Sequence, residues 1–591
     1  MSLYKDASLV MIPSAYKDGK LYSIRPTDGS GDFTFSRGSN LAATRVDVNG
    51  LIEKGRENIL TYSNDFSQSD WAKTGISLVS GGQSGYDGSN NAFIITSNTS
   101  TTNHYLRQSA STQSGVQTYS IYAKGNGYDV QLRATGVGGT TNWVSFNLIS
   151  GSVGTSGAGI IESKMTSLGN GWYRCSAAFN DSGSPFIGIY MVEDADTAGS
   201  GPSYTGDGSS GIFLQDAQAE QGLVATDYIE TGASTAQAGI LEDLPRLDYS
   251  GGASCPALLL EPQRSNLIDN SEYITNTNVV TIAYNQTISP QGLENAMKIT
   301  ANSGLNNHYV SSSSFPIVSG SVVGSVYAKK GNVNWIRLRL NQSSSNIRAW
   351  FDLENGVVGD IDSGGQADII DMGNGWYRCI VIEPTSTAVA SSASLQIFIQ
   401  TSNAQTQFDA VGDEYVYLFG AQEENPASYP TSYIPTMGSA VTRSRDFSEA
   451  VFTENDIAPT GGTTLFIEFE TSGEVDTTPN TGGFYLKNNA GTLGHWGMSF
   501  GYGDRIYSNY QNGSTIQWDG ATPENTLCKV AFQLVNGGKS FLNGTTKATT
   551  SVDWSTRQLG QLELQYGTRV KQAILFPTIL TDSECIALTT I

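Results

Sequence analysis

A chain of 591 residues is too long for one hydrophobic core, and its length predicts three or four domains. With 66 Gly, 28 Tyr, 22 Phe and only 15% charged residues, its composition favours all-β sandwiches over helical folds and argues against wholesale disorder. The formal net charge of −22 argues against a nucleic-acid partner, because phosphate binding needs clustered Lys and Arg, and against an anionic membrane surface. A well-solvated acidic exterior explains the charge by itself.

Residues 1–55 are predicted to form an N-terminal attachment or connector segment. They hold a short apolar run at 9–13 and a strand and turn at 33–40, Phe-Thr-Phe-Ser-Arg-Gly-Ser-Asn. The stretch is too short and too polar to build a core alone. We therefore expect it to need a partner surface or to pack on the following domain.

The next 385 positions contain an internal duplication, with one copy at 56–240 and the other, preceded by a connector, at 241–440. Residues 169–175, Gly-Asn-Gly-Trp-Tyr-Arg-Cys, recur unchanged at 373–379, an offset of 204 residues. Other matches at an offset of 204 or 205 are Asn103-His104-Tyr105 with Asn307-His308-Tyr309, Tyr122-Ala123-Lys124 with Tyr327-Ala328-Lys329, Phe146 with Phe351, Ala217-Gln218 with Ala421-Gln422, and Tyr228-Ile229 with Tyr433-Ile434. Both copies show short period-two runs between Gly, Ser and Asn clusters, which predicts two β-sandwiches.

A shorter sequence repeat occurs in the connectors. Residues 44–60 resemble residues 245–268, and a weaker version, Val-Thr-Arg-Ser-Arg-Asp, stands at 441–446. We interpret it as a structured joint that begins each module. Two hypotheses stand for its arginines: they tie neighbouring modules through charge-assisted hydrogen bonds, or they are ordinary exposed linker residues.

The last domain is predicted at 441–591. Alternating runs at 464–470, 483–486, 530–534 and 561–564 predict strands. Residues 578–588 predict one short helix, with Thr581 or Asp582 as its N-cap.

Each repeat runs in the same order: Tyr-Ala-Lys, Phe-x-Leu-x-x-Gly-x-Val-Gly, Gly-Asn-Gly-Trp-Tyr-Arg-Cys, Ala-Gln-x-Glu, Tyr-Ile. This order resembles carbohydrate-binding-module β-jelly-rolls found in phage fibre and tail-associated proteins. The last domain, through residues 465–469, 541–544 and 580–588, is similar to concanavalin-A-like or laminin-G-like sandwiches. The segments 33–40 and 244–252 resemble parts of tailed-phage fibre and appendage proteins. The expected fold is all-β, with three jelly-roll sandwiches in tandem after a short N-terminal attachment segment.

Catalytic and metal-binding constellations are not evident. Glu468 and Glu470 share one face of a predicted strand, but the downstream acid of the glucanase pattern is missing. The histidines are one to a module, which fits neither a catalytic triad nor a metal site: His104, His308 and His495. The five cysteines, Cys175, Cys255, Cys379, Cys528 and Cys585, show no zinc or disulfide spacing, and the repeat-matched Cys175 and Cys379 are expected as buried thiols. We predict no enzyme activity and no cofactor, with a structural calcium ion compatible with such sandwiches.

Sugar binding needs exposed flat aromatic rings beside polar groups. The candidates are Trp71, Tyr86, His104, Tyr105, Trp143, His308, Tyr309, Trp335, Trp350, Trp496, Tyr502 and Trp518. Packing is the competing interpretation for each, and a strand-end hydrogen-bonding cluster competes for the matched Asn-His-Tyr. The shared Trp172 and Trp376 are assigned to the core.

The resemblance implies a non-enzymatic virion structural protein, a fibre or appendage on a tail or capsid. Its implied partners are other virion proteins, bound through the N-terminal segment, and host-surface glycans; a homotrimer is the expected state. No apolar leader opens the sequence and no run approaches the roughly 18 residues of a membrane span, so we expect synthesis in the host cytoplasm, no membrane insertion and display on the virion. The alternatives are a polysaccharide depolymerase with accessory binding modules, a decoration protein that only stabilises the particle, and a bacterial adhesin or glycan-degradation accessory protein.

Overall fold

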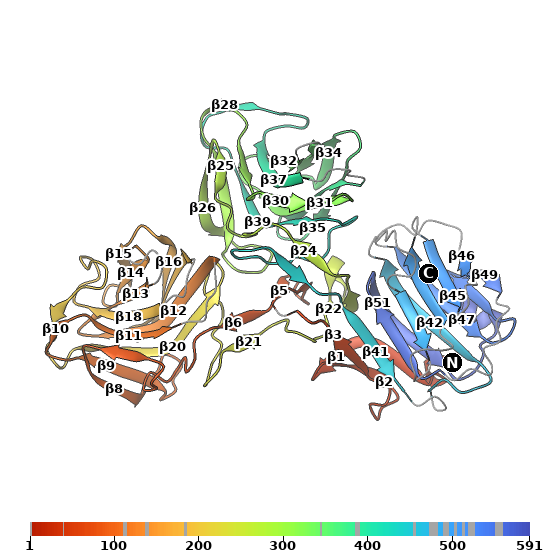
Figure 1. The fold of residues 1–591 in the computed structure, drawn as a ribbon, viewed down its shortest axis with the longest axis horizontal. Helices are drawn as coiled ribbons and strands as arrows, with labels where there is room; N and C mark the ends of the chain where they lie inside the picture. The colour runs from red at the N-terminus through yellow and green to blue at the C-terminus, as the bar shows by residue number, and fades with distance from the viewer. Residues whose placement is uncertain are drawn as a thin grey trace.

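The computed structural model consists of antiparallel sheets arranged in three lobes (Figure 1). It describes residues 3–39, 41–109, 115–135, 141–181, 186–342, 346–384, 390–452, 457–471, 483–487, 496–501, 505–510, 515–517, 526–549 and 559–591. The first two lobes are sandwiches 1 and 2, and the third is the C-terminal sandwich. The all-β expectation is confirmed.

Sandwich 1 stacks two six-stranded sheets, ordered β15-β14-β13-β18-β11-β7 and β16-β17-β12-β20-β9-β8. The strands of the first sheet are β7 (Ala72–Thr74), β11 (His104–Ser109), β13 (Asp129–Thr135), β14 (Trp143–Asn147), β15 (Ser152–Ser156) and β18 (Phe186–Val192). Those of the second are β8 (Ile76–Gln83), β9 (Ala92–Ser97), β12 (Gly115–Asn126), β16 (Ile160–Gly169), β17 (Trp172–Asp181) and β20 (Gly211–Gln221). Two short ladders close it: β10 (Thr101–Thr102) with β19 (Tyr204–Thr205), and β6 (Arg56–Asn58) with β21 (Ala236–Ala238).

Sandwich 2 repeats this topology, with sheets ordered β34-β33-β32-β37-β29-β25 and β35-β36-β31-β39-β27-β26. The first sheet holds β25 (Asn276–Asn278), β29 (Tyr309–Ser311), β30 (Phe315–Ile317), β32 (Trp335–Asn341), β33 (Asn346–Asp352), β34 (Val357–Ile361) and β37 (Ala390–Gln400). The second holds β26 (Val280–Thr287), β27 (Ala296–Ala301), β31 (Val322–Lys330), β35 (Gln366–Asp371), β36 (Trp376–Glu383) and β39 (Tyr415–Glu424). Its short ladders are β28 (Gly304–Asn306) with β38 (Phe408–Ala410), and β24 (Arg264–Asn266) with β40 (Val441–Arg443).

The duplication is confirmed by strand order and by local detail. In both copies the Gly-Asn-Gly turn before the Trp-Tyr-Arg-Cys strand places its Asn at positive φ, 51° at Asn170 and 53° at Asn374. Asn tolerates this left-handed conformation better than most residues that carry a Cβ. Cys175 and Cys379 are both fully buried in the sandwich cores, as expected.

The C-terminal sandwich is assembled from three separate chain segments. Its N-terminal strands are β1 (Leu9–Lys17), β2 (Lys20–Arg25) and β3 (Phe33–Ser36), and β22 (Leu247–Asp248) and β23 (Ala257–Leu260) come from the connector. The others are β41 (Phe447–Val451), β42 (Thr463–Thr471), β43 (Gly483–Lys487), β44 (Trp496–Gly501), β45 (Arg505–Tyr510), β46 (Thr515–Gln517), β47 (Leu527–Leu534), β48 (Lys539–Leu542), β49 (Thr545–Thr549), β50 (Gln561–Gln565) and β51 (Thr568–Phe576). Helix α2 (Asp582–Thr589) has Thr581 as its N-cap in a capping box with Glu584, so the predicted helix is confirmed.

The expected boundaries 1–55 and 241–440 are corrected by this arrangement. Strand β1 pairs with β51 and β3 pairs with β41, so the N-terminal strands lie beside the C-terminal ones (Figure 1). Leu9 and Met11 alternate into the core of the C-terminal sandwich, which supplies the partner surface that these residues lack alone. Likewise β23 pairs with β51 and buries Leu258 and Leu260 in the same core. The remaining connector strands, β4 (Thr44–Val46) and β5 (Ile52–Lys54), form a hairpin, and Ile52 packs against sandwich 2.

A buried charge network joins these segments. Arg246 bonds to Glu261 at 2.7 Å and to Asp446, Arg443 lies 3.0 Å from Glu261, and Arg37 lies 3.5 Å from Asp446. Burial raises the pKa of Glu261, but Arg443 and Arg246 outweigh burial and hold that pKa well below its ordinary value. At Arg246 and Arg443 the structure therefore supports the hypothesis that connector arginines tie modules together. Elsewhere in the connector, Arg45 forms a partly exposed pair with Glu53.

Candidate functional site

The candidate site is built on the sheet of each sandwich that contains β11 or β29. In sandwich 1, β11 turns Leu106 into the core and Tyr105 and Arg107 outward. The Tyr105 ring stacks on Tyr190 of β18, with centroids 4.6 Å apart and planes at 30°. The Arg107 guanidinium carbon lies 5.7 Å from the Tyr105 ring and 4.8 Å from the Phe186 ring.

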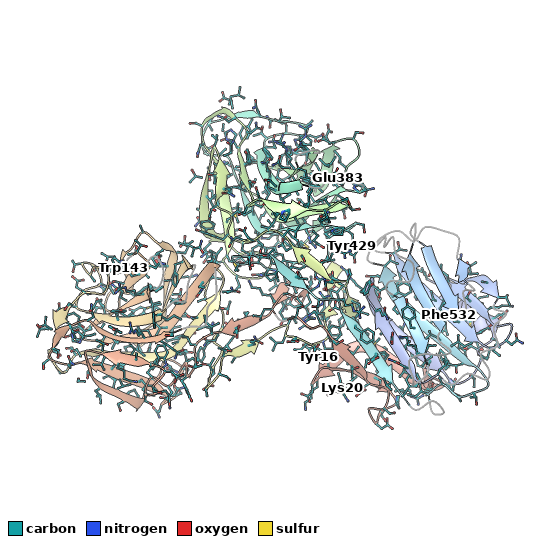
Figure 2. All side chains as sticks on the ribbon, viewed as in Figure 1. Tyr16, Lys20, Trp143, Glu383, Tyr429 and Phe532 are labelled. Atoms are coloured by element: carbon teal, nitrogen blue, oxygen red, sulfur yellow. The ribbon has the colours of Figure 1, made fainter. Side chains whose placement is uncertain are left out.

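The same surface continues onto β13 and β14. The Arg133 guanidinium lies 5.4 Å from the Tyr190 ring, and Arg133 stands opposite Trp143 in the strand register. Gln131 lies on the same side of β13 as Arg133. Its side chain donates to the Gly199 carbonyl and accepts from the Gly201 N–H, so the loop that contains these two glycines covers the middle of the sheet. Figure 2 shows Trp143 among the strands of sandwich 1. We call this surface outer face 1; its residues are Tyr105, Arg107, Gln131, Arg133, Trp143, Phe186 and Tyr190.

Outer face 2 is the matching surface of sandwich 2, formed by Tyr309, Trp335, Arg337, Arg339, Arg348, Trp350, Gln396 and Phe398. Tyr309 and Phe398 have ring centroids 4.6 Å apart, like their counterparts Tyr105 and Tyr190. The Arg337 guanidinium lies 3.7 Å from the Phe398 ring and 5.5 Å from the Trp350 ring. Both faces therefore carry aromatic rings interleaved with arginines, a pattern in which each cation rests on a ring's negative face.

Arg337 is the most unusual charge on outer face 2. Its side chain is almost completely buried, and it donates to the Thr406 carbonyl at 3.4 Å. Among the described residues no acceptor meets its Nε. Burial, and then the nearby Arg348 and Arg339, lower the pKa of Arg337 to about 10, so the guanidinium stays charged at neutral pH. On the same face the Gln396 Oε1 is buried without a hydrogen-bond partner in the described part of the chain, an arrangement that costs free energy unless something else satisfies it.

Four of the candidate sugar-binding residues are buried, which corrects their assignment to an accessible binding surface; Trp350 lies on outer face 2 but beneath the loop that holds Gln405. Trp71 and Trp350 are buried, and their ring N–H groups donate to the carbonyls of Tyr62 and Gln405. His104 and His308 are fully buried as well. Their rings bond strand-end carbonyls, those of Tyr204 at 3.2 Å and Val279 at 2.9 Å, so the matched histidines are structural.

The other candidates are placed as follows. Tyr105, Trp143, Tyr309 and Trp335 are half-buried residues of the two outer faces. Tyr86 lies on the opposite sheet of sandwich 1, stacked on Tyr122 at 4.0 Å, and donates to Asp216, whose pKa burial raises to about 6. The side chain of Trp496, together with Tyr502 and Trp518, lies outside the described residues. The shared Trp172 and Trp376 are buried, in small clusters beside the main cores.

The arginines of the outer faces were missed from the sequence. A signal existed in the run Trp335-Ile-Arg-Leu-Arg-Leu, where arginines occupy every second position between buried apolar residues. Such alternation places them on one surface of the sheet.

The acids that share a strand in the C-terminal sandwich are paired with other side chains. Glu470 lies 2.6 Å from Lys571, and Glu468 accepts from Gln572 at 2.5 Å. Among the described residues no group of three or more His, Cys, Asp or Glu is placed to hold a metal ion. In that part of the chain no helix has the length and apolarity needed to span a membrane.

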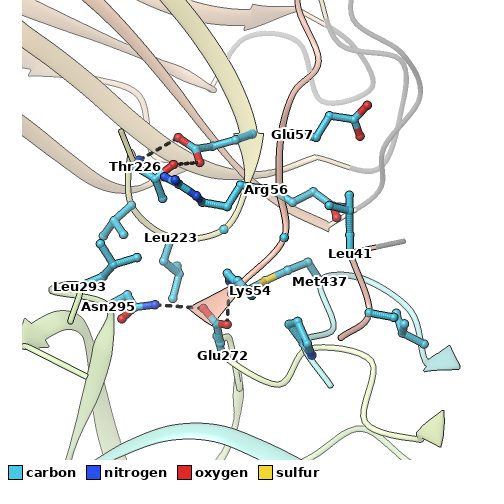
Figure 3. A pocket seen from close by; sticks show the side chains of 18 of the residues that line it. Leu41, Lys54, Arg56, Glu57, Leu223, Thr226, Glu272, Leu293, Asn295 and Met437 are labelled. Atoms are coloured by element: carbon cyan, nitrogen blue, oxygen red, sulfur yellow. Dashed lines mark hydrogen bonds and ion pairs between the residues drawn. The ribbon is translucent and has the colours of Figure 1, made fainter. Parts of the chain in front are cut away.

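A cavity of about 290 Å³ lies where sandwich 1, sandwich 2 and the connector meet (Figure 3). Lys54 of β5 pairs with Glu272 of sandwich 2 at 3.1 Å, and Asn295 donates to the same carboxylate. On the facing wall the Glu220 carboxylate accepts from Thr226, as the dashed lines in Figure 3 show. Because Lys54 of the connector pairs with Glu272 of sandwich 2, we interpret the cavity as part of the joint between the sandwiches.

No family model and no curated protein matches this chain. Solved structures similar to it include the sialidase CBM40 of Ruminococcus gnavus bound to α2,3-sialyllactose. It is 18% identical with a TM-score of 0.19, and the match covers 22% of this chain and 84% of that one. Another is the CBM22-1–CBM22-2 tandem of Paenibacillus barcinonensis Xyn10C, 13% identical with a TM-score of 0.19, covering 65% of this chain and 98% of that one. Likeness this distant carries no conclusion about what the present chain binds.

Proposed function

We propose that this protein is a non-enzymatic structural protein of a tailed-phage virion that binds host-surface glycans through outer faces 1 and 2. The observation that carries the binding proposal is the repetition of one surface on both copies of the sandwich. In each, a half-buried tyrosine, Tyr105 or Tyr309, packs against a second ring, and an arginine lies over one ring of the pair: Arg107 over Tyr105 and Arg337 over Phe398. Aromatic rings pack against the C–H face of a pyranose, and adjacent donors bind its hydroxyls.

Two such faces in one chain favour multivalent attachment. Each site would bind weakly, and joining sites on one particle raises overall avidity by about 10²–10⁴ when the geometry allows simultaneous contact. A homotrimer would add further copies. We propose display on the particle surface, with synthesis in the host cytoplasm.

The proposed attachment to other virion proteins uses the N-terminal strands. These strands are built into the C-terminal sandwich, so the contact would be made by their outward side chains. Tyr22 and Ile24 of β2 are 39% and 48% exposed, which gives that strand an apolar outer surface.

The binding proposal is tested by glycan-array binding of the full chain and of Tyr105→Ala, Tyr309→Ala and the double variant. Tyr415→Ala is the matched control, because Tyr415 is a half-buried ring on the other sheet of sandwich 2. We expect each single outer-face variant to weaken binding, the double variant to abolish it, and the control to bind like the parent. Unchanged binding by the double variant would exclude these faces. A fall in the length of a bound polysaccharide on incubation would favour the depolymerase instead.

A further inference from the structure

We infer that outer faces 1 and 2 select anionic sugar chains, those that carry carboxylate or sulfate groups. This inference rests on the proposed glycan binding and names the ligand class of the same faces. It starts from the charge on outer face 2. Arg337, Arg339 and Arg348 lie on the adjacent strands β32 and β33, where Arg339 stands opposite Arg348 and Arg337 opposite Trp350.

Of these three arginines, only Arg348 forms an ion pair with a carboxylate among the described residues. Asp362 binds Arg348 in a two-bond pair, at 2.7 Å to Nε and 3.0 Å to the terminal nitrogen. Arg339 instead bonds the neutral Asn346 side chain, at 2.7 and 3.0 Å, and Arg337 bonds a backbone carbonyl. Within the described residues no carboxylate lies at ion-pair distance from Arg337 or Arg339, and Asp362 acts on Arg337 only at longer range. This positive surface stands out in a chain whose net charge is −22.

Outer face 1 carries the same feature in a more open form. The Arg107 guanidinium lies near both the Tyr105 and Phe186 rings, and in the described part of the chain no carboxylate pairs with it. Arg107 is half-buried and Phe186 is 37% exposed, so a ligand in solution can reach both.

The chemistry of guanidinium groups decides the ligand class. A guanidinium presents a planar fork of donors that matches carboxylate and sulfate oxygens. Contacts with aromatic rings restrict its motion, so less conformational entropy is lost when it binds an anion. A neutral sugar would desolvate these cations without neutralising them. An anionic sugar satisfies both parts of the surface: on outer face 1 its ring packs on Tyr105 and its charge meets Arg107, and on outer face 2 its charge meets the half-buried Arg339.

The test compares matched pairs of glycans on the full-length protein: sialylated and desialylated, sulfated and desulfated, uronic-acid-containing and carboxyl-reduced. We expect the anionic member of a bound pair to bind about tenfold or more tightly, the effect of losing one charge-assisted contact. The difference should shrink as salt rises from about 50 to 500 mM, because exposed charges are then screened.

Three variants locate the effect. Arg107→Gln and Arg339→Gln should each weaken binding of the anionic member of a pair more than binding of the neutral member, so that the ratio of the two affinities falls. Arg337→Gln introduces the residue type found at the matched position of sandwich 1, where Gln131 stands, so we expect this variant to fold. Its affinity for the anionic glycan gives a second measurement on outer face 2, beside that of Arg339→Gln. The matched control is Lys298→Gln, which removes one positive charge from the other sheet of sandwich 2.

The outcomes separate the two proposals. If no glycan binds, the proposed function fails and this inference fails with it. Equal, salt-independent binding of both members of each pair would overturn the anionic preference and leave glycan binding in place. Equal binding to polyglutamate would also overturn it, because the faces would then attract any polyanion. Loss of anionic binding in Lys298→Gln to the same extent as in Arg339→Gln would show that net charge, and not these faces, is responsible.

Discussion

Glu423 allows a quantitative test of how sandwich 2 is stabilised. This residue of β39 is fully buried, and neither carboxylate oxygen has a hydrogen-bond partner among the described residues. It stands opposite Gly324, and Leu340 and Leu395 border the space over that glycine. In sandwich 1 the matched pair is Ala219 opposite Tyr119. Where sandwich 1 has the large Tyr119, sandwich 2 therefore has Gly324, and where sandwich 1 has the small Ala219, sandwich 2 has the buried acid Glu423.

Burial raises the pKa of Glu423 from its ordinary value of 4.5 to about 8. The folded protein then holds the proton more tightly than the unfolded chain does. Stability from this group is fully present below pH 4.5 and is lost as the pH rises toward 8. Each pH unit in that window is worth about 1.4 kcal/mol, so sandwich 2 should lose about 3 kcal/mol between pH 4.5 and 7 and about 5 kcal/mol by pH 8.

Glu423→Gln removes the titration at nearly constant volume, and Glu423→Met also replaces the polar end with an apolar one. We expect both variants to abolish the pH dependence, and Glu423→Met to exceed the parent in stability above pH 7. Hydrogen–deuterium exchange of the full chain, read on peptides from β31 and β39 and corrected for intrinsic rates, measures the local free energy of opening.

The matched control is Ala219→Glu, which places a carboxylate at the equivalent position of sandwich 1. Peptides from β12 and β20 should then acquire the pH dependence that sandwich 2 loses. The reasoning is refuted if the parent protein protects β39 equally at pH 5 and pH 8, or if Glu423→Met opens more easily than the parent at pH 8.

Three further predictions follow from the packing. Arg246→Met leaves Glu261 and Asp446 buried with fewer compensating charges, so the unfolding temperature should fall by an amount corresponding to about 3–5 kcal/mol; an unchanged calorimetric transition would contradict this. Deleting residues 1–36 uncovers residues 573–575 of β51 and the edge of β41, and light scattering should then report aggregation, whereas a monomeric truncated chain would show that these strands are dispensable. Cys255 is exposed and the other four thiols are buried, so a thiol reagent should modify one cysteine in the native protein and five after denaturation, as counted by mass spectrometry.

Local patterns were sufficient to predict part of this fold. The repeated motifs and the period-two runs predicted two sandwiches and their strands, because alternation is a property of neighbouring residues. The pairing of β1 with β51 was not predicted, because it joins residues more than 500 positions apart. A strand's sequence shows which side chains it buries and does not show which edge it will meet.

For the candidate site, too, the sequence was sufficient to predict some of the residues and insufficient for others. Residue type identified Tyr105 and Tyr309, and it equally selected Trp71 and Trp350, which the structure buries. The difference depends on which side of a sheet faces the core and on which loop covers the other side. For Trp350 that cover is the loop whose Gln405 carbonyl accepts the indole N–H.

The two copies differ where the glycan is proposed to bind. In the matched ladders, the inward Leu132 and Leu338 are the same residue, whereas the outward Gln131 corresponds to Arg337. Two further exchanged outward pairs are Ser145 with Trp350 and Trp143 with Arg348. From these exchanges on the outer faces we predict that the two faces bind different sugars. Tyr105→Ala and Tyr309→Ala should therefore remove different members from a glycan-array profile, and identical losses would show that both faces bind the same ligand.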